Sequence, residues 1–333
     1  MINVSVVVLV YNTEFYIDRC VRSLLKQTLD KMEFIFINDC TPDKSMSILK
    51  SVLDDYPHRK EQVCIVNNEV NKGSAYCRNL GVSYAHGEYL IFCDSDDWVD
   101  TDAYEQMYLE ARKNNSDILL TDYFLNYVDK ERYVKQHDYS IGKNYVKAML
   151  EGHLHGSTCN KLVKRSLYTE YDINYEQDIN LWEDMLINVK LFSVARKITY
   201  MPVAFYHYWR ANDLSYTHSK NKEVIYDQHK VVLILEDLLR DYEFLPEFNS
   251  SFCLLKLRVK TYLLMHADCD QELKSLTPLY PEANGYISKC DNISFLWKIL
   301  LYFSSYNYVT VSKLIIFLGN ALKTIKYRII ISL

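Results

Sequence analysis

The first 120 residues of the chain alternate short apolar runs with segments in which apolar residues recur every three or four positions. Residues 4–10 form a continuous valine-rich run, which is typical of a parallel strand buried on both faces. Further strands are predicted at 34–37, 63–66, 89–93 and 118–121, with helices between them at 17–25, 41–53, 74–85 and 101–112. Because strands and helices alternate, the pattern predicts an α/β fold with a mostly parallel sheet and helices on both faces. Thr13 is the expected cap of the first helix.

The pattern changes in the second half of the chain. Residues 133–155 are polar and aromatic without a clear period, so they are predicted to be irregular. A helix at 184–195 and a strand at 198–209 follow, and long helices are then predicted at 223–242, at 247–267 and twice beyond Ile293. This change predicts a boundary near residue 218, between an α/β domain at 1–218 and a helical region at 219–333.

Composition narrows the class of protein. A net charge of -5 argues against a nucleic-acid binder, which normally presents a strongly basic surface. The nine cysteines include no Cys-x-x-Cys pair, so we expect reduced thiols in a cytoplasmic protein and neither a disulfide framework nor a zinc ribbon. Residues 1–10 have no basic leader, and Lys298, Lys313 and Lys323 interrupt the most apolar tract, so neither a signal peptide nor a membrane-spanning helix is predicted.

The strongest chemical signal is the run Asp94-Ser95-Asp96-Asp97, which directly follows a predicted strand. Carboxylates at positions i and i+2 after a strand can face one cavity, where they can bind a divalent cation that neutralises a diphosphate. The alternative is an acidic loop that caps the next helix. Tyr11 and Asp39 also follow predicted strands, and ligands of parallel sheets bind at the carboxyl ends of the strands. We therefore expect these residues along one edge of one crevice.

These residues belong to an ordered set of motifs that resembles bacterial glycosyltransferases of family 2, which are inverting enzymes with the GT-A fold. The set comprises Val10-Tyr11-Asn12, Asn38-Asp39 with Thr41 and Asp43, Asn71-x-Gly73, Arg78-Asn79-x-Gly81, Gly87-Glu88-Tyr89, the Asp94 run and Trp182-Glu183-Asp184. The match covers residues 3 to about 216. Leu9 and Cys40 stand where the family usually has proline and glycine, which affects only local backbone geometry.

The resemblance implies a role for each motif. Tyr11, Glu14 and Asp39 would surround the nucleobase, Arg78 would approach the ribose or diphosphate, and Ser95 would lie with them in the nucleotide site. Asp94 and Asp96 form the family's Asp-x-Asp motif, in which Asp96 is the expected direct ligand of Mn²⁺ or Mg²⁺. His207 would complete the metal sphere, and Arg210 would hold phosphate. The alternatives are a helix cap for Asp39, a surface ion pair for Arg78 and a core position for His207.

A base is also required, because a hydroxyl attacks poorly until its proton is removed. Glu183 and Asp184 open a predicted helix, and the family pattern assigns the base to Asp184, with Glu183 holding an acceptor hydroxyl or the loop. An acidic pair at a helix N-terminus is also favoured by the helix dipole without any catalytic role.

The C-terminal helices have two interpretations. Leu314, Leu318, Leu322, Ile325 and Ile329 would share one face of a helix, opposite Lys313, Asn320, Lys323 and Tyr327. A basic amphipathic helix is typical of a segment that lies on an anionic membrane. Packing on the catalytic domain or on a second copy, giving a homodimer, is the alternative.

Together these features predict an inverting hexosyl- or N-acetylhexosaminyl-transferase. Its donor would be a nucleotide sugar, with a UDP-sugar favoured, and its acceptor a hydroxyl of a glycan or polyprenyl-linked glycan in cell-surface polysaccharide synthesis. The expected location is the cytoplasm, with peripheral contact to the inner face of the membrane. A sugar nucleotidyltransferase is a weaker alternative, because no glycine-rich phosphate loop follows the first strand. A non-catalytic, membrane-associated scaffold is the third.

Overall fold

The computed structural model describes residues 2–212 and 221–331, and the side chains of residues 2–212 and 221–321. The chain forms two compact units. The first comprises residues 1–146 and 154–220, and the second comprises residues 147–153 and 221–333. The predicted boundary near residue 218 lies outside the described residues.

The first unit is built on a nine-stranded sheet with the order β3-β2-β1-β4-β8-β6-β9-β5, in which β7 also pairs with β6. The strands are β1 (Val4–Val10), β2 (Met32–Asn38), β3 (Val63–Asn67), β4 (Tyr89–Asp94), β5 (Trp98–Val99), β6 (Ile118–Asn126), β7 (Glu131–Val134), β8 (Lys161–Lys164) and β9 (Ile198–Trp209). Strands β3, β2, β1 and β4 are parallel, as predicted. The later strands include antiparallel pairs, such as β4 with β8 and β6 with β8, so the sheet as a whole is mixed.

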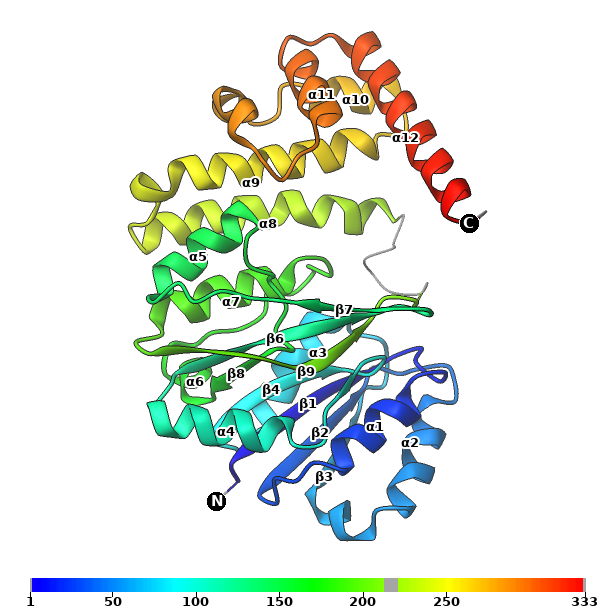
Figure 1. Cartoon of the computed structure of the whole chain (residues 1–333), viewed down its shortest axis with the longest axis vertical. Helices are drawn as coiled ribbons and strands as arrows, with labels where there is room; N and C mark the ends of the chain where they lie inside the picture. The colour runs from blue at the N-terminus through cyan, green and yellow to red at the C-terminus, as the bar shows by residue number, and fades with distance from the viewer. Residues whose placement is uncertain (1, 213–220, 332–333) are drawn as a thin grey trace. The chain divides into compact units, whose positions relative to one another are not determined.

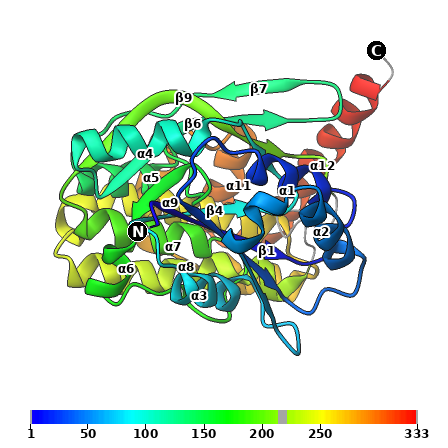
Figure 2. The ribbon, with the colours of Figure 1, turned by 90° about the horizontal axis from the view of Figure 1, so that it is seen from below.

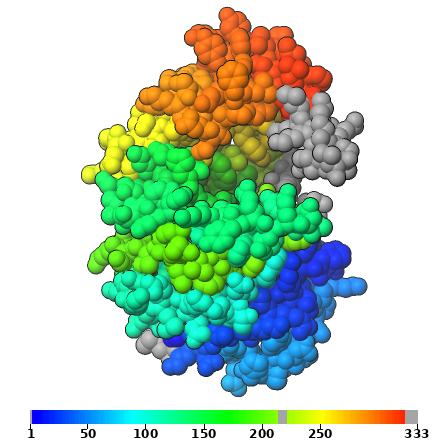
Figure 3. All heavy atoms as spheres, in the orientation of Figure 1, coloured from blue at the N-terminus to red at the C-terminus, as the bar shows by residue number. Residues whose placement is uncertain are grey.

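Helices cover both faces of this sheet, which confirms the predicted α/β fold. The helices of the first unit are α1 (Ile17–Leu25), α2 (Ser45–Asp54), η1 (Pro57–Gln62), α3 (Ser74–Tyr84), α4 (Ala103–Asn114), α6 (Ser166–Glu170) and α7 (Glu183–Val194). Helix α5 (Gly142–Glu151) begins in the first unit, and its residues 147–151 belong to the second. Figures 1 and 2 show α1, α2 and α4 on one face and α3, α6 and α7 on the other. The space-filling view in the same orientation shows residues 1 to about 100 in blue to cyan (Figure 3).

Helix α3 packs directly on β1. Val7 in β1 is fully buried. A Cβ atom added at Gly81 of α3 would lie 2.2 Å from Val7 Cγ1, so any larger side chain would force the helix away from the strand. Arg78 lies three residues before Gly81 and so on the same side of α3. The close packing at Gly81 therefore helps to fix the position of Arg78 relative to the sheet.

The second unit is helical. It contains the end of α5 and α8 (Lys222–Asp241), α9 (Leu245–Met265), α10 (Asp270–Leu276), η3 (Pro281–Lys289), α11 (Phe295–Ser305) and α12 (Val309–Ile331). The helices predicted at 223–242 and 247–267 are confirmed to within two residues at each end. Among the described helices, none has an apolar stretch long enough to cross a bilayer.

Helix α12 differs in detail from the predicted amphipathic pattern. Leu314 and Leu318 are both exposed, but so is Lys313, which was expected on the opposite face and which donates to Asp270 Oδ1 at 2.7 Å. The buried position between them is Ile315. The remaining predicted face, from Leu322 onward, has no described side chains.

Two other local predictions are wrong. Residues 133–155 are not irregular throughout, because they include the end of β7 and the whole of α5. Strand β7 forms because β6 continues to Asn126 and pairs with it as a hairpin. Thr13 does not cap α1, whose N-cap residue is Tyr16; instead, the Thr13 N–H donates to the hydroxyl of Ser45 at 3.1 Å.

Candidate active site

The carboxyl ends of β2, β1 and β4 form one edge of the sheet. These strands are adjacent and parallel, and Val10 pairs with Asn38 while Leu9 pairs with Asp94. Tyr11, Asp39 and the Asp94 run therefore lie at three neighbouring strand ends, as the sequence predicted, with Asp94 as the last residue of β4. The register of the sheet alone brings them together.

Asp94 and Asp96 present their carboxylates differently. Asp94 has a side chain 38% exposed, and its Oδ2 accepts from the Cys159 thiol at 3.3 Å. Asp96 Oδ2 accepts from Asn212 Nδ2 at 2.7 Å. Partial withdrawal from solvent raises the pKa of both carboxyl groups above the ordinary value for aspartate, and the nearby Asp96 carboxylate adds to the rise at Asp94. Ser95, between them, is buried.

Asp97 is completely buried and is held by hydrogen bonds from β9. Its carboxylate accepts a short hydrogen bond from the Tyr206 hydroxyl and another, at 2.7 Å, from the Trp209 N–H. Burial and the neighbouring Asp96 and Asp94 raise its pKa well above the ordinary value. Asp97 thereby ties β9 to the loop that carries Asp94 and Asp96.

Arg78 joins the two acidic motifs. Its Nη1 lies 2.5 Å from Glu183 Oε1, and its Nη2 lies 3.4 Å from Asp184 Oδ1 and 3.6 Å from Asp94 Oδ1. The Arg78 side chain is only 7% exposed, so these pairs are sheltered from solvent. The predicted contact of Arg78 with ribose or phosphate stays a prediction, since its described partners are carboxylates.

Glu183 and Asp184 open α7, as the sequence predicted. Asp184 keeps a side chain 21% exposed, and its Oδ1 has no hydrogen-bond donor among the described residues, although Arg78 Nη2 is nearby. Burial raises the pKa of Asp184, while Arg78 opposes that shift. Burial also raises the pKa of Glu183 to about 7, again against the attraction of Arg78. The Glu183 side chain is only 11% exposed, so Asp184 is the more solvent-accessible of the two carboxylates.

The predicted nucleobase residues follow β1 and β2 along the same edge. Tyr11 is 39% exposed. The Asp39 carboxylate is buried and accepts from Asn68 Nδ2 and from the N–H groups of Lys72 and Gly73, at 2.8 to 2.9 Å. Glu14 Oε2 accepts from the Lys44 N–H at 3.1 Å. Asp39 and Glu14 thus order the loops around this end of the crevice, and Asp39 does not cap the helix α2, which was the alternative.

His207 lies in a stack of flat side chains. Its ring is sandwiched between Trp98, at 4.8 Å, and Phe124, at 4.7 Å, and the guanidinium of Arg19 lies 3.6 Å above the other face of Trp98. One ring nitrogen is 3.2 Å from Asn126 Oδ1 and 3.3 Å from Glu131, and the other is 3.2 Å from Asp100. These contacts hold the ring among protein side chains, and the metal role of His207 stays a prediction.

Arg210 follows β9 directly. Its Nη1 lies 3.3 Å from the Tyr208 hydroxyl, and its backbone N–H donates to Asn126 at 2.8 Å. No described contact places Arg210 against Asp94 or Asp96, so its predicted role toward phosphate is not tested.

Several residues around the carboxylates carry no sequence motif that pointed to them. Cys159 and Asn212 donate to Asp94 and Asp96, and Arg19 donates to the Asp96 carbonyl at 2.9 Å. In the sequence, these residues are distinguished only by lying close to a motif or a strand end. Tertiary packing brings them to the carboxylates.

The donor set at Asp94 and Asp96 fits a hard divalent cation in part. The described residues contain no group of three or more His, Cys, Asp or Glu side chains arranged to hold a metal ion. Two carboxylates separated by one residue nevertheless suit Mg²⁺ or Mn²⁺, because such ions are commonly bound by one or two carboxylates together with substrate phosphates and water. Asp96 and Asp94 are the residues that would hold the ion.

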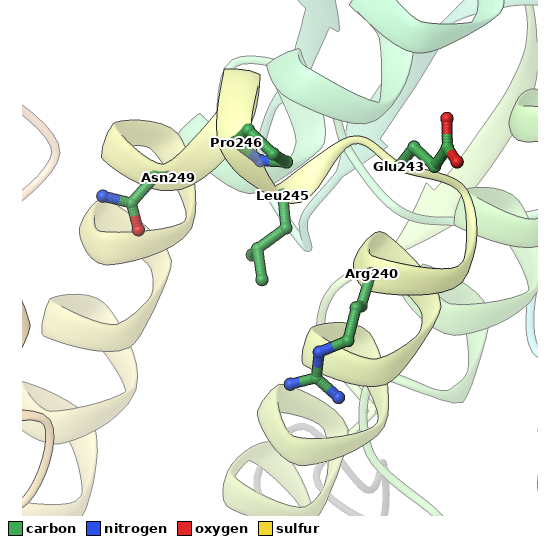
Figure 4. A pocket seen from close by; sticks show the side chains of 5 residues that line it. All are labelled: Arg240, Glu243, Leu245, Pro246 and Asn249. Carbon is green, nitrogen blue, oxygen red and sulfur yellow. The ribbon is translucent and has the colours of Figure 1, made fainter.

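The second unit has a recess at the connection between α8 and α9. It is lined by Arg240, Glu243, Leu245, Pro246 and Asn249 (Figure 4). None of these residues belongs to the motifs at the strand ends, so the recess is separate from the candidate active site in sequence and in composition.

Comparison with known proteins agrees with this geometry. The sequence profile of the family described as Glycosyl transferase family 2 matches residues 5–172. EpsH of Bacillus subtilis (strain 168), which is named as a glycosyltransferase, is 31% identical over 62% of this chain and 60% of its own length. The poly(ribitol-phosphate) beta-glucosyltransferase of Bacillus spizizenii is 30% identical over 62% of this chain and 32% of its own length. The chain thus spans less than two thirds of both relatives.

A solved structure shares the fold over almost the whole chain. Residues 1–349 of S. aureus TarS, crystallised with UDP-GlcNAc, superimpose with a TM-score of 0.64 at 18% identity, covering 94% of this chain and 90% of that chain. At this level of identity the similarity concerns the fold.

Proposed function

The chain belongs to glycosyl transferase family 2, and from this premise we propose that it is an inverting glycosyltransferase that moves a sugar from a nucleotide sugar to an acceptor hydroxyl. Asp184 is the general base. Arg78, Asp94 and Asp96 lie on the side of the departing diphosphate.

The single observation that carries this proposal is the position of Arg78. One buried guanidinium lies within 3.6 Å of Asp94, the last residue of β4, and within 3.4 Å of Asp184, in the first turn of α7. A donor bound at the Asp94 run would therefore have its anomeric carbon close to the carboxylate of Asp184. That proximity is what a single displacement requires.

The chemistry of the step follows from this arrangement. The acceptor oxygen attacks the anomeric carbon from the face opposite the diphosphate, its proton passes to Asp184, and the bond from the anomeric carbon to the diphosphate oxygen breaks. The configuration inverts because there is one displacement. Proton removal by a placed base contributes about 100- to 10,000-fold. A divalent cation at Asp96 and Asp94, when bound, supplies positive charge to the departing diphosphate.

The substrate classes are proposed from the relatives. The UDP-GlcNAc complex of TarS favours a UDP-sugar donor, in agreement with the hexosyl- or N-acetylhexosaminyl-transferase expected from the motifs. The poly(ribitol-phosphate) beta-glucosyltransferase favours an acceptor that is a hydroxyl of a polymer. The glycan or polyprenyl-linked glycan of cell-surface polysaccharide synthesis, which the motifs imply, is the acceptor class that we propose. Asp39 and Tyr11 would select the nucleobase.

We also propose that the protein is cytoplasmic and makes peripheral contact with the inner face of the membrane. After Asp291 the sequence contains five basic residues and no acidic residue. Leu314, Phe317 and Leu318 on α12 are 57%, 69% and 46% exposed. Exposed apolar side chains beside positive charge suit an anionic bilayer surface. A homodimer that uses the same face is the alternative. Sedimentation with anionic vesicles would indicate membrane contact, whereas a dimer in size-exclusion chromatography would indicate the homodimer.

The main test is a product assay. The protein is incubated with Mn²⁺ and a panel of nucleotide sugars and acceptor glycans, and released nucleoside diphosphate is measured. Asp184→Asn should abolish transfer while sparing binding of the donor, whereas Asp54→Asn, on the exposed side of α2, should change neither. Release of pyrophosphate would instead indicate a nucleotidyltransferase. No turnover together with no donor binding would indicate a non-catalytic scaffold.

A further inference from the structure

Lys161, at the start of β8, is a charged side chain inside the protein. It is 1% exposed. Its ammonium donates to the carbonyl of Ser157, to the carbonyl of His155 at 3.2 Å and to Asn160 Oδ1 at 3.0 Å. An ammonium has three N–H donors, so the three acceptors use all of them. The buried ammonium is compensated by these three hydrogen bonds, which in turn fix residues 155–160.

A second tie holds the same segment from the other side. Asn188 Nδ2, in α7, lies 2.6 Å from the Gly156 carbonyl, 3.3 Å from the Ser157 carbonyl and 2.8 Å from the Asp184 carbonyl. The side chain of Asn188 is therefore shared between residues 156–157 and the first turn of the helix that carries Asp184. Any movement of the segment also loosens the contact next to Asp184.

Residues 155–160 also contact Asp94, the carboxylate on the proposed nucleotide-sugar side of the site. Cys159 donates to Asp94 Oδ2 at 3.3 Å, and the Asn160 carbonyl accepts from the Thr121 N–H at 3.0 Å. Residues 155–160 thus touch Asp94 at one end and the start of α7 at the other. An acceptor hydroxyl that attacks between a donor at Asp94 and a base at Asp184 would pass along this segment.

We propose that Lys161 is a positioning residue for glycosyl transfer, which holds residues 155–160 as the wall between Asp94 and Asp184 and so sets where the acceptor hydroxyl enters. This inference rests on the proposed function and assigns the acceptor side of the same site. Asn188 holds the same segment through the carbonyls of Gly156 and Ser157. Neither side chain needs to touch the substrate.

The test separates acceptor placement from donor binding. In Lys161→Met we expect kcat for transfer to fall about 100-fold, because a misplacement of about 1 Å in a reacting group costs that much. The KM for the acceptor should rise, hydrolysis of the nucleotide sugar by water should increase relative to transfer, and the Kd of the donor should stay within about threefold. Asn188→Ala should show the same signature more weakly, and the double variant should lose less than the sum, since both hold one segment.

Lys164→Met is the control, because Lys164 lies on the same strand, is 30% exposed and is 3.8 Å from Asp117. It should behave as the wild type. A folded Lys161→Met protein with an unchanged ratio of transfer to hydrolysis and an unchanged acceptor KM would overturn the proposal. A loss of donor affinity equal to the loss of kcat would also overturn it, as that is the signature of general damage.

If Lys161→Met does not fold, Lys161→Gln, which keeps two of the three donors, and Asn188→Ala carry the same comparison. Failure of the proposed function looks different: the wild type would then release no nucleoside diphosphate, or Asp184→Asn would retain transfer.

Discussion

Arg78 Nη1 lies 2.5 Å from Glu183 Oε1, in an ion pair that joins α3 to the first turn of α7. The two residues are 105 positions apart in the chain. Because the same guanidinium also lies near Asp94 and Asp184, one positive charge is shared among three carboxylates. Arg78 therefore has a structural task in addition to any contact it makes with a donor.

The first prediction concerns stability. Arg78→Met should lower the free energy of unfolding by about 3–5 kcal/mol, because it leaves buried carboxylates without their counter-charge. Arg78→Lys should recover only part of this, since one ammonium cannot bridge partners as a planar guanidinium does. Urea unfolding measures both.

Arg22→Met is the matched control for this comparison. Arg22 pairs with Asp18 at 3.0 Å and with Asp55 at 2.8 Å, but its side chain is 37% exposed. Its loss should cost less than about 1 kcal/mol. Equal losses for Arg78→Met and Arg22→Met would show that Arg78 is not the buried link described above.

The second prediction separates Asp96 from Asp97. Asp96→Asn should weaken binding of Mn²⁺ in the presence of UDP by about tenfold or more, with little change in stability, because the carboxylate is a hard oxygen ligand and the amide is a poor one. Asp97→Asn should cost about 1–3 kcal/mol of stability, because it disturbs the buried bonds to Tyr206 and Trp209. Calorimetric titration with Mn²⁺ and urea unfolding give the two readings. Unchanged Mn²⁺ affinity in Asp96→Asn would remove Asp96 as a ligand.

The third prediction asks whether Asp39 recognises the nucleobase as well as its own loop. Three protein donors already use its carboxylate, which can accept about four hydrogen bonds. If the fourth comes from the uracil imide, the wild type should bind UDP about tenfold or more tightly than UDP methylated at N3. Asp39→Asn should then bind both equally weakly. Equal affinity of the wild type for the two ligands would leave Asp39 with the loop alone.

The sequence predicts the strand-end part of this site well, because apolar runs define the parallel strands and a parallel register brings their ends to one edge. Asp39 and Asp94 need nothing more than that register. The link between Arg78 and Glu183 depends instead on how α3 and α7 pack on the sheet, and no local pattern encodes a contact across 105 positions. Cys159 and Asn212 were missed for the same reason. The stack of Arg19, Trp98 and His207 also required the pairing of β5 with β9, two elements that are far apart in the chain.

The last prediction concerns pH. Burial raises the pKa of Glu183 to about 7, above the ordinary 4.5, so the folded protein binds this proton more tightly than the unfolded chain does. The stability that Glu183 contributes is then fully present below about pH 4.5 and is lost as the pH rises toward 7. Relative to Glu183→Gln, which cannot ionise, the wild type should lose unfolding free energy between pH 5 and pH 7.5. Parallel urea titrations of both proteins at several pH values measure the difference, in which any constant cost of the substitution cancels. A difference that is independent of pH, or that grows in favour of the wild type as the pH rises, would show that Arg78 keeps Glu183 ionised throughout this range.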